Sequence, residues 1–80
     1  AVEIRSPGQT IESQRERCRF YLTHGAEEAW LVIPETRTIE VFDGERDGTA
    51  YTSGTVPSSS LAGFVVEVEA LFEGLGSEYA

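Results

Sequence analysis

The chain has 80 residues, enough for one small domain with a thin stability margin, because a chain of this size buries only about 60% of its unfolded surface. Hydrophobic residues at 40% and charged residues at 25% are ordinary for a globular protein. The formal net charge of −8 argues against strong binding of nucleic acid through phosphate neutralisation. It does not exclude metal-dependent chemistry, which uses acidic ligands.

Three sequence features bear on the expected compartment and on membrane association. No apolar run approaches the roughly 18 residues that cross a bilayer, so no membrane partner is expected. The first residues have neither the basic segment nor the apolar segment of a secretory signal. Cys18 is the single cysteine and cannot form an internal disulfide, which favours a reducing cytoplasm.

A strand and a helix are predicted first. Small or apolar residues alternate with charged ones over residues 1–5, and Ser-Pro-Gly at 6–8 ends this strand. Thr10 has the side chain of an N-cap, and apolar residues then recur at helical spacing. The helix therefore spans roughly 14 residues, and His24 and Gly25 are typical of its C-terminal end.

Two strands are predicted next. The continuous apolar run at 29–33 predicts a central strand buried on both faces, with Trp30 in the core. After a turn at 34–37, the alternation at 38–42 predicts a half-buried strand that pairs as a hairpin and ends at 43–44.

The last third of the chain gives weaker signals. Residues 45–60 are rich in Gly, Ser, Thr and Asp, and the one element predicted within them is a short strand at 50–52. Residues 65–72 favour a short strand followed by a helical turn. A helix that connects the first two strands implies that they are parallel. The expected fold is an α/β mixed sheet with a short C-terminal helix.

Several motifs carry a family resemblance. Val-Glu-Ile-Arg-Ser-Pro at 2–7, a helix ending Arg-x3-Tyr-Leu-x2-Gly at 17–25, and Trp-Leu-Val-Ile-Pro-Glu-Thr-Arg-Thr-Ile-Glu-Val-Phe at 30–42 follow one another. Their order is similar to that of Uma-type domains, which typically read VEVxSP, K…YLxAGV and WLVDPETRTVEVY. Leu-Ala-Gly-Phe at 61–64 with Leu-Phe at 71–72 resembles a closing LPGF…LF. The chain thus resembles the C-terminal part of an Uma-type restriction endonuclease domain, of the PD-(D/E)xK nuclease superfamily.

This resemblance implies a fold, a site and a metal ion. Residues 1–73 are expected to form a restriction-endonuclease-like core fragment, a partial nuclease-like domain, and 74–80 a flexible tail. Glu3 matches the family's metal-binding Glu, and the Ile4 carbonyl would add a second oxygen to Mg²⁺ or Mn²⁺. The alternative for Glu3 is an exposed strand carboxylate without a function.

Both candidates for the catalytic cation depart from the expected lysine. Arg5 lies two residues after Glu3, where the superfamily pattern has Lys, and Arg17 lies where Uma-type domains carry a Lys on the helix. Arginine can clamp phosphate but does not readily act as a base. The alternative for Arg17 is a surface charge paired with Glu12 or Glu16.

The remaining polar and reactive residues have simpler interpretations. Tyr21 matches the family's Tyr and is equally explained by core packing. His24 is interpreted as a helix-end residue, because no second metal-binding residue lies at a suitable spacing. Cys18 lies on the apolar stripe of the helix and is expected to be buried and unreactive.

Two functions remain open. The first is metal-dependent hydrolysis of DNA phosphodiesters, expected to be incomplete or inactive here because the family's first metal-binding acid lies on a strand before the one at residues 1–5. DNA is a partner by resemblance, although the net charge disfavours it. The second is a non-catalytic protein that forms homo-oligomers, such as a dimer, through an exposed sheet edge at residues 1–5.

Overall fold

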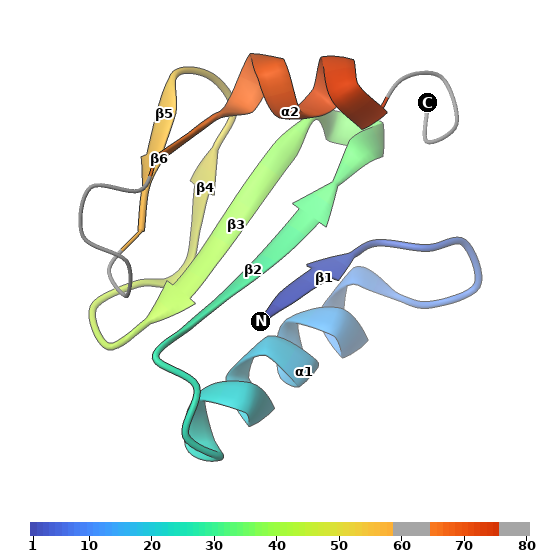
Figure 1. Cartoon of the computed structure of the whole chain (residues 1–80). Helices are drawn as coiled ribbons and strands as arrows, with labels where there is room; N and C mark the ends of the chain where they lie inside the picture. The colour runs from blue at the N-terminus through green and yellow to red at the C-terminus, as the bar shows by residue number, and fades with distance from the viewer. Residues whose placement is uncertain (59–64, 76–80) are drawn as a thin grey trace.

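A computed structural model of the chain describes residues 1–58 and 65–75 (Figure 1). In chain order its elements are β1 (Val2–Ile4), α1 (Ile11–Thr23), β2 (Glu28–Ile33), the 3₁₀ turn η1 (Pro34–Thr36), β3 (Thr38–Asp43), β4 (Asp47–Tyr51), β5 (Thr55–Pro57), β6 (Val65–Glu67) and α2 (Val68–Leu75). Neither helix in this part of the chain is long and apolar enough to cross a membrane.

Four strands form the main sheet, in the order β1-β2-β3-β4. β1 is parallel to β2, with Val2 opposite Trp30 and Ile4 opposite Val32. β2 and β3 are antiparallel, as are β3 and β4, so the sheet is mixed. The α/β mixed sheet predicted from the element order is confirmed.

The central strand β2 is buried along its whole length, as its apolar run predicts. Residues on one face pack under α1, in a cluster of Cys18, Ala29, Leu31, Ile33 and Phe42. Residues on the other face pack under α2 and the β5–β6 pair, in a cluster of Trp30, Val32, Ile39, Val41, Val56, Val68 and Phe72. Each fully buried aliphatic or aromatic side chain contributes about 1.5–3 kcal/mol, so both covers are needed for stability.

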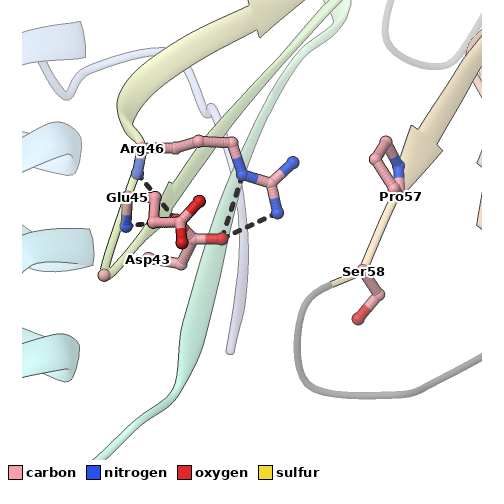
Figure 2. Close-up of a pocket in the computed structure, with 6 residues that line it drawn as sticks. Asp43, Glu45, Arg46, Pro57 and Ser58 are labelled. Atoms are coloured by element: carbon pink, nitrogen blue, oxygen red, sulfur yellow. Dashed lines mark hydrogen bonds and ion pairs between the residues drawn. The ribbon is translucent and has the colours of Figure 1, made fainter.

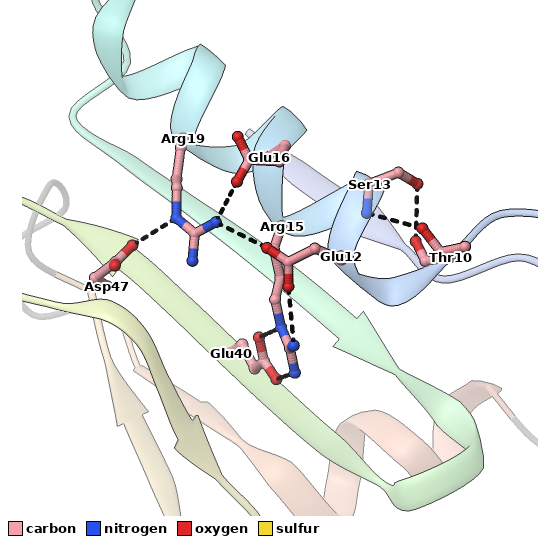
Figure 3. A network of polar contacts seen from close by, with 8 residues as sticks. All are labelled: Thr10, Glu12, Ser13, Arg15, Glu16, Arg19, Glu40 and Asp47. Carbon is pink, nitrogen blue, oxygen red and sulfur yellow. Dashed lines mark hydrogen bonds and ion pairs between the residues drawn. The ribbon is translucent and has the colours of Figure 1, made fainter.

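The predicted half-burial of β3 is wrong, because this strand is also covered on both faces. Glu40 points to the α1 side and is only 7% exposed. Arg15 of α1 binds it with two hydrogen bonds, Nε to Oε1 at 2.8 Å and Nη2 to Oε2 at 2.7 Å (Figure 3). Polar and apolar residues do alternate over 38–42, but the two hydrogen bonds from Arg15 allow the charged Glu40 side chain to be buried.

The short strand predicted at 50–52 overlaps the end of a longer strand, β4, and β5 was not predicted. β4 pairs with β3 across a bulge, at which Val41 is opposite Thr49 and Phe42 is opposite Asp47. Gly48, between these partners, has φ +81° and lies against the Phe42 ring, a position that favours glycine. β5 then pairs with β6. The bulge interrupts the period-two pattern, so the sequence indicates only the end of β4.

The ends of the helices agree with their sequence signals. The Thr10 hydroxyl accepts a hydrogen bond from the Ser13 N–H at 3.0 Å, and Gly25 follows the helix with φ +103°. The strand and helix predicted at 65–72 are present as β6 and α2. Gly74 and Leu75 are helical; the rest of the predicted tail and the motif at 61–64 lie outside the described residues.

The first prediction concerns the Arg15–Glu40 pair. Arg15→Met leaves a buried carboxylate without its partner, and we expect it to cost about 3 kcal/mol of unfolding free energy, the lower end for a buried pair. Urea denaturation followed by circular dichroism measures this cost.

Two further variants test the cause. Arg15→Met with Glu40→Met removes both charges and should recover most of the lost stability. Arg19→Met is the matched control, since its carboxylate partners Glu12, Glu16 and Asp47 are all exposed, and it should cost less than about 1 kcal/mol. Equal costs for the two single variants would contradict the assignment.

The second prediction concerns Cys18, which is fully buried. Burial, with the nearby Glu3 and Glu40 carboxylates, raises the pKa of its thiol to about 11. We therefore expect no reaction with a thiol-specific disulfide reagent at pH 8 in the native state, and rapid reaction in urea. Fast native-state labelling would show that α1 opens readily.

Candidate functional site

Three side chains from β1 and α1 converge on one carboxylate. Glu3 is at the middle of β1 and lies opposite Leu31, on the α1 side of the sheet. The Tyr21 hydroxyl donates a hydrogen bond to Glu3 Oε1 at 2.9 Å, and Arg17 Nη1 donates to the same atom at 3.3 Å. Arg17 and Tyr21 are four residues apart and therefore adjacent on one face of the helix.

The electrostatics of this cluster leave one carboxylate oxygen available. The Glu3 side chain is 18% exposed, and no described residue forms a hydrogen bond with its Oε2. The hydrogen bond to Glu3 raises the pKa of Tyr21, so the phenol stays protonated and remains a donor at neutral pH. Arg17 is about half exposed and can reach an anion in solvent while it stays close to Glu3.

The Ile4 carbonyl lies beside this cluster and already has one partner. Gln14 is 2% exposed, and its Nε2 donates to the Ile4 carbonyl at 3.2 Å. A carbonyl oxygen has two lone pairs, so a second partner can still bind. The Oε1 of Gln14 is buried without a hydrogen bond in the described part of the chain.

The donor set fits a hard divalent cation only at its lower limit. Glu3 Oε2 and the Ile4 carbonyl are the oxygen ligands that Mg²⁺ prefers, and Mg²⁺ is usually held by one or two carboxylates with waters and phosphate oxygens. Within residues 1–58 and 65–75, no group of three His, Cys, Asp or Glu side chains could hold a metal ion. Glu3 is the acid on which Arg17 and Tyr21 converge.

The two arginines predicted for catalysis have different partners. Arg17 contacts Glu3, whereas Arg5 Nη1 donates to Glu35 Oε2 at 2.6 Å, next to the end of β2. The alternative pairing of Arg17 with Glu12 or Glu16 is not observed; these acids bind Arg15 and Arg19 (Figure 3). Arg17 is thus the cation that the fold places at Glu3.

Sequence reasoning missed the contact between Tyr21 and Glu3. Tyr21 does pack against the core cluster under α1, as predicted, but its hydroxyl reaches the site. The spacing of four residues from Arg17 was the available signal. An open hollow continues outward from this point, lined by Ser13, Glu16, Arg17, Phe20 and Tyr21. Phe20 is 56% exposed there and is stacked on His24, with 3.9 Å between ring centroids.

A second cavity, of about 370 Å³, lies between the β3–β4 turn and the end of β5 (Figure 2). Arg46 fills its polar side: Nε and Nη2 contact Asp43 Oδ2 at 2.9 and 2.7 Å, and Nη2 also reaches Glu28 at 3.4 Å. Its Nη1 donates to the Tyr51 hydroxyl at 2.9 Å. Because every guanidinium nitrogen is already bonded, this cluster holds the turn in place and is not the better candidate for a site.

Comparisons with known proteins identify the family and the fold. The family model of Uma2, described as "Putative restriction endonuclease", matches residues 1–76. A search of curated proteins finds no match.

One solved structure that matches is the crystal structure of a "putative nuclease belonging to DUF820" from Anabaena variabilis ATCC 29413. It is 26% identical in sequence, with a TM-score of 0.81, and the match covers 94% of this chain. The chain spans 44% of the length of that nuclease. With the family model matching nearly all of the chain, the protein belongs to the Uma2 family of restriction-endonuclease-like proteins and has a nuclease-like fold.

Proposed function

We propose that this chain carries the Glu3 half of a metal-dependent site for hydrolysis of DNA phosphodiesters. The observation that carries the proposal is the convergence of Arg17 and Tyr21 on one oxygen of Glu3, with the other oxygen left without a hydrogen bond in the described residues. Family membership and the nuclease neighbour favour the same chemistry.

Each residue of the site has a distinct proposed role. Glu3 Oε2 and the Ile4 carbonyl would hold Mg²⁺ or Mn²⁺; such an ion withdraws electron density from a phosphate and makes water a stronger acid. Tyr21 orients Glu3 through its hydrogen bond. Arg17 would contact the phosphate and offset its developing charge. Arg5 is the weaker candidate for that role, because Glu35 already holds its guanidinium.

The site is proposed to be incomplete within these 80 residues. A single carboxylate binds a divalent cation weakly, and a second acid from outside this cluster would strengthen it. Phe20, at the mouth of the hollow beside Arg17, offers a ring on which a base could stack. The free, buried thiol of Cys18 is compatible with the cytoplasmic location expected from the sequence.

A second candidate function is non-catalytic self-association. The unpaired outer side of β1 in the described sheet favours it, because open strand edges invite pairing with another chain.

The third prediction tests hydrolysis directly. Supercoiled plasmid incubated with the chain and Mn²⁺ or Mg²⁺ should be nicked slowly, and chelation should abolish the nicking. Glu3→Gln should reduce the nicking rate by about 100-fold or more, since it removes the metal-binding carboxylate. Glu27→Gln, at an exposed position before β2, is the matched control and should leave the rate unchanged. Nicking that is absent with both metals, or equal in Glu3→Gln, would refute the proposal for this chain.

The fourth prediction separates the two arginines. Arg17→Gln should lower the nicking rate by about 10²-fold, in the range for loss of one charge-stabilising donor, and Arg17→Lys should restore part of it. Arg5→Gln should have a smaller effect on nicking, because its partner Glu35 is not part of the Glu3 cluster. A larger loss in Arg5→Gln than in Arg17→Gln would reverse the assignment.

A further inference from the structure

Gln14 is a buried polar side chain on the flank of α1 that faces β1 (Figure 1). It lies three residues before Arg17 and seven before Tyr21, so the three side chains share one face of the helix. Arg17 and Tyr21 reach Glu3 from this face, and Gln14 reaches the Ile4 carbonyl. The helix thus presents three polar side chains in a row to two consecutive residues of β1.

The amide of Gln14 has one end bonded and one end without a partner. Its Nε2 donates to the Ile4 carbonyl at 3.2 Å, at the long limit for an N–H···O hydrogen bond. Its Oε1 is buried and accepts no hydrogen bond from the described residues. Because a buried polar atom without a partner is destabilising, a glutamine at this position calls for an explanation. A ligand that uses the amide oxygen would supply one.

The spacing between Gln14 and Ile4 suits two ligands of one cation. Neighbouring oxygens around an octahedral Mg²⁺, each about 2.1 Å from the ion, are about 3.0 Å apart. The Gln14 amide nitrogen is 3.2 Å from the Ile4 oxygen, and half a turn about χ3 would put Oε1 in its place while the carbon atoms stay where they are. Side-chain amide oxygens and peptide carbonyls are hard ligands of the same kind.

We infer that Gln14 Oε1 is a ligand of the cation held by Glu3 and Ile4, and that its amide turns when the ion binds. This inference rests on the metal-binding role proposed for Glu3. Without an ion, Nε2 faces the Ile4 carbonyl because the two form a hydrogen bond. With an ion on that carbonyl, the partial positive charge of the N–H group is repelled and the partial negative charge of Oε1 is attracted. The site then uses a carboxylate oxygen, a peptide oxygen and a side-chain amide oxygen from β1 and α1.

The competing arrangement keeps the hydrogen bond. In it, the ion uses the second lone pair of the Ile4 carbonyl, and Gln14 only orients that carbonyl through Nε2. The two arrangements make different demands on the side chain at position 14, because the first needs an oxygen and the second needs a donor. An ionised glutamate provides the oxygen and cannot donate, so Gln14→Glu separates them.

Nuclear magnetic resonance of the wild-type chain observes the amide directly. The sequence has no asparagine and two glutamines, Gln9 and Gln14, so the carboxamide region contains two pairs of N–H signals. Titration of Mg²⁺, which is diamagnetic, should shift the Gln14 pair and move its Cδ signal downfield, because a cation on Oε1 withdraws electron density from that carbon. The Ile4 carbonyl carbon should shift at the same ion concentrations, and the exposed Gln9 should stay unchanged.

Variants at position 14 measure the contribution of the ligand. Gln14→Met removes both amide atoms at similar side-chain length, and it should raise the dissociation constant for Mn²⁺, measured by electron paramagnetic resonance, by about tenfold or more, at least the cost of losing an outer-shell partner. Gln14→Glu should bind Mn²⁺ at least as tightly as the wild type. Gln9→Met is the matched control at an exposed position and should leave the dissociation constant unchanged.

Urea denaturation in chelator checks that the variants are folded. Gln14→Met should be at least as stable as the wild type, because it removes the unpartnered Oε1. Gln14→Glu should be less stable in chelator, where its carboxylate is buried beside a carbonyl, and should gain more stability from Mn²⁺ than the wild type does. The direction of the Cδ shift in the wild-type chain keeps the test decisive even where Gln14→Glu does not fold.

The outcomes separate this inference from the proposed function. Mn²⁺ binding that needs Glu3 but is unchanged in Gln14→Met overturns the ligand role of Gln14 and leaves the proposed hydrolysis in place. Binding by a folded Gln14→Glu variant that is as weak as in Gln14→Met also overturns it, and assigns Gln14 to orienting the Ile4 carbonyl. Ion binding that depends on Glu3 and Gln14, without plasmid nicking, would sustain the ligand and refute hydrolysis. A chain that binds neither ion would refute both.

Discussion

The burial of β2 and β3 on both faces is the constraint on which the rest of the fold depends. In the described residues α1 covers one face of the four-stranded sheet, and α2 with β5 and β6 covers the other. A charged side chain on these strands needs a partner of opposite charge within the fold, because an unpaired buried charge costs several kcal/mol. Glu40 on β3 meets this condition through Arg15.

The same ion pair, together with the apolar cluster under α1, holds the helix against the sheet. Arg15 and Arg19 point to the β3–β4 side, where they bind Glu40 and Asp47 (Figure 3). Arg17 and Tyr21 point to the other side, where they meet Glu3. One side of α1, with Arg15 and Arg19, therefore binds the helix to β3 and β4, and the other side, with Arg17 and Tyr21, forms the candidate site. The precision of the site depends on docking contacts formed two strands away.

Sequence patterns correctly predicted the elements that depend on interactions between residues close together in the chain. The apolar run of β2, the Thr10 cap and Gly25 all act through nearby residues, and each is found where the sequence placed it. Only the end of β4 was predicted, because the bulge at Gly48 breaks its alternation, and the burial of β3 was missed because Arg15 is 25 residues away from Glu40 in the chain. Glu3 and one of the two candidate cations, Arg17, are in contact in the structure. That Arg5 binds Glu35 could not be inferred from spacing, since the turn of the chain at η1 brings Glu35 to it.

The distribution of charge leaves little free positive charge on the chain for a phosphate backbone. Of the six arginines, five form ion pairs with carboxylates, and Arg37 lies over the Phe72 ring. Most arginines of the chain are thus paired with its own carboxylates. The net charge of −8 opposes the approach of a phosphate backbone. Arg17 is the arginine held at Glu3, and by itself it cannot offset that field. Under the proposed function, a divalent ion at Glu3 would place positive charge beside Arg17 and the Tyr21 hydroxyl, so any affinity for DNA would be tied to metal occupancy.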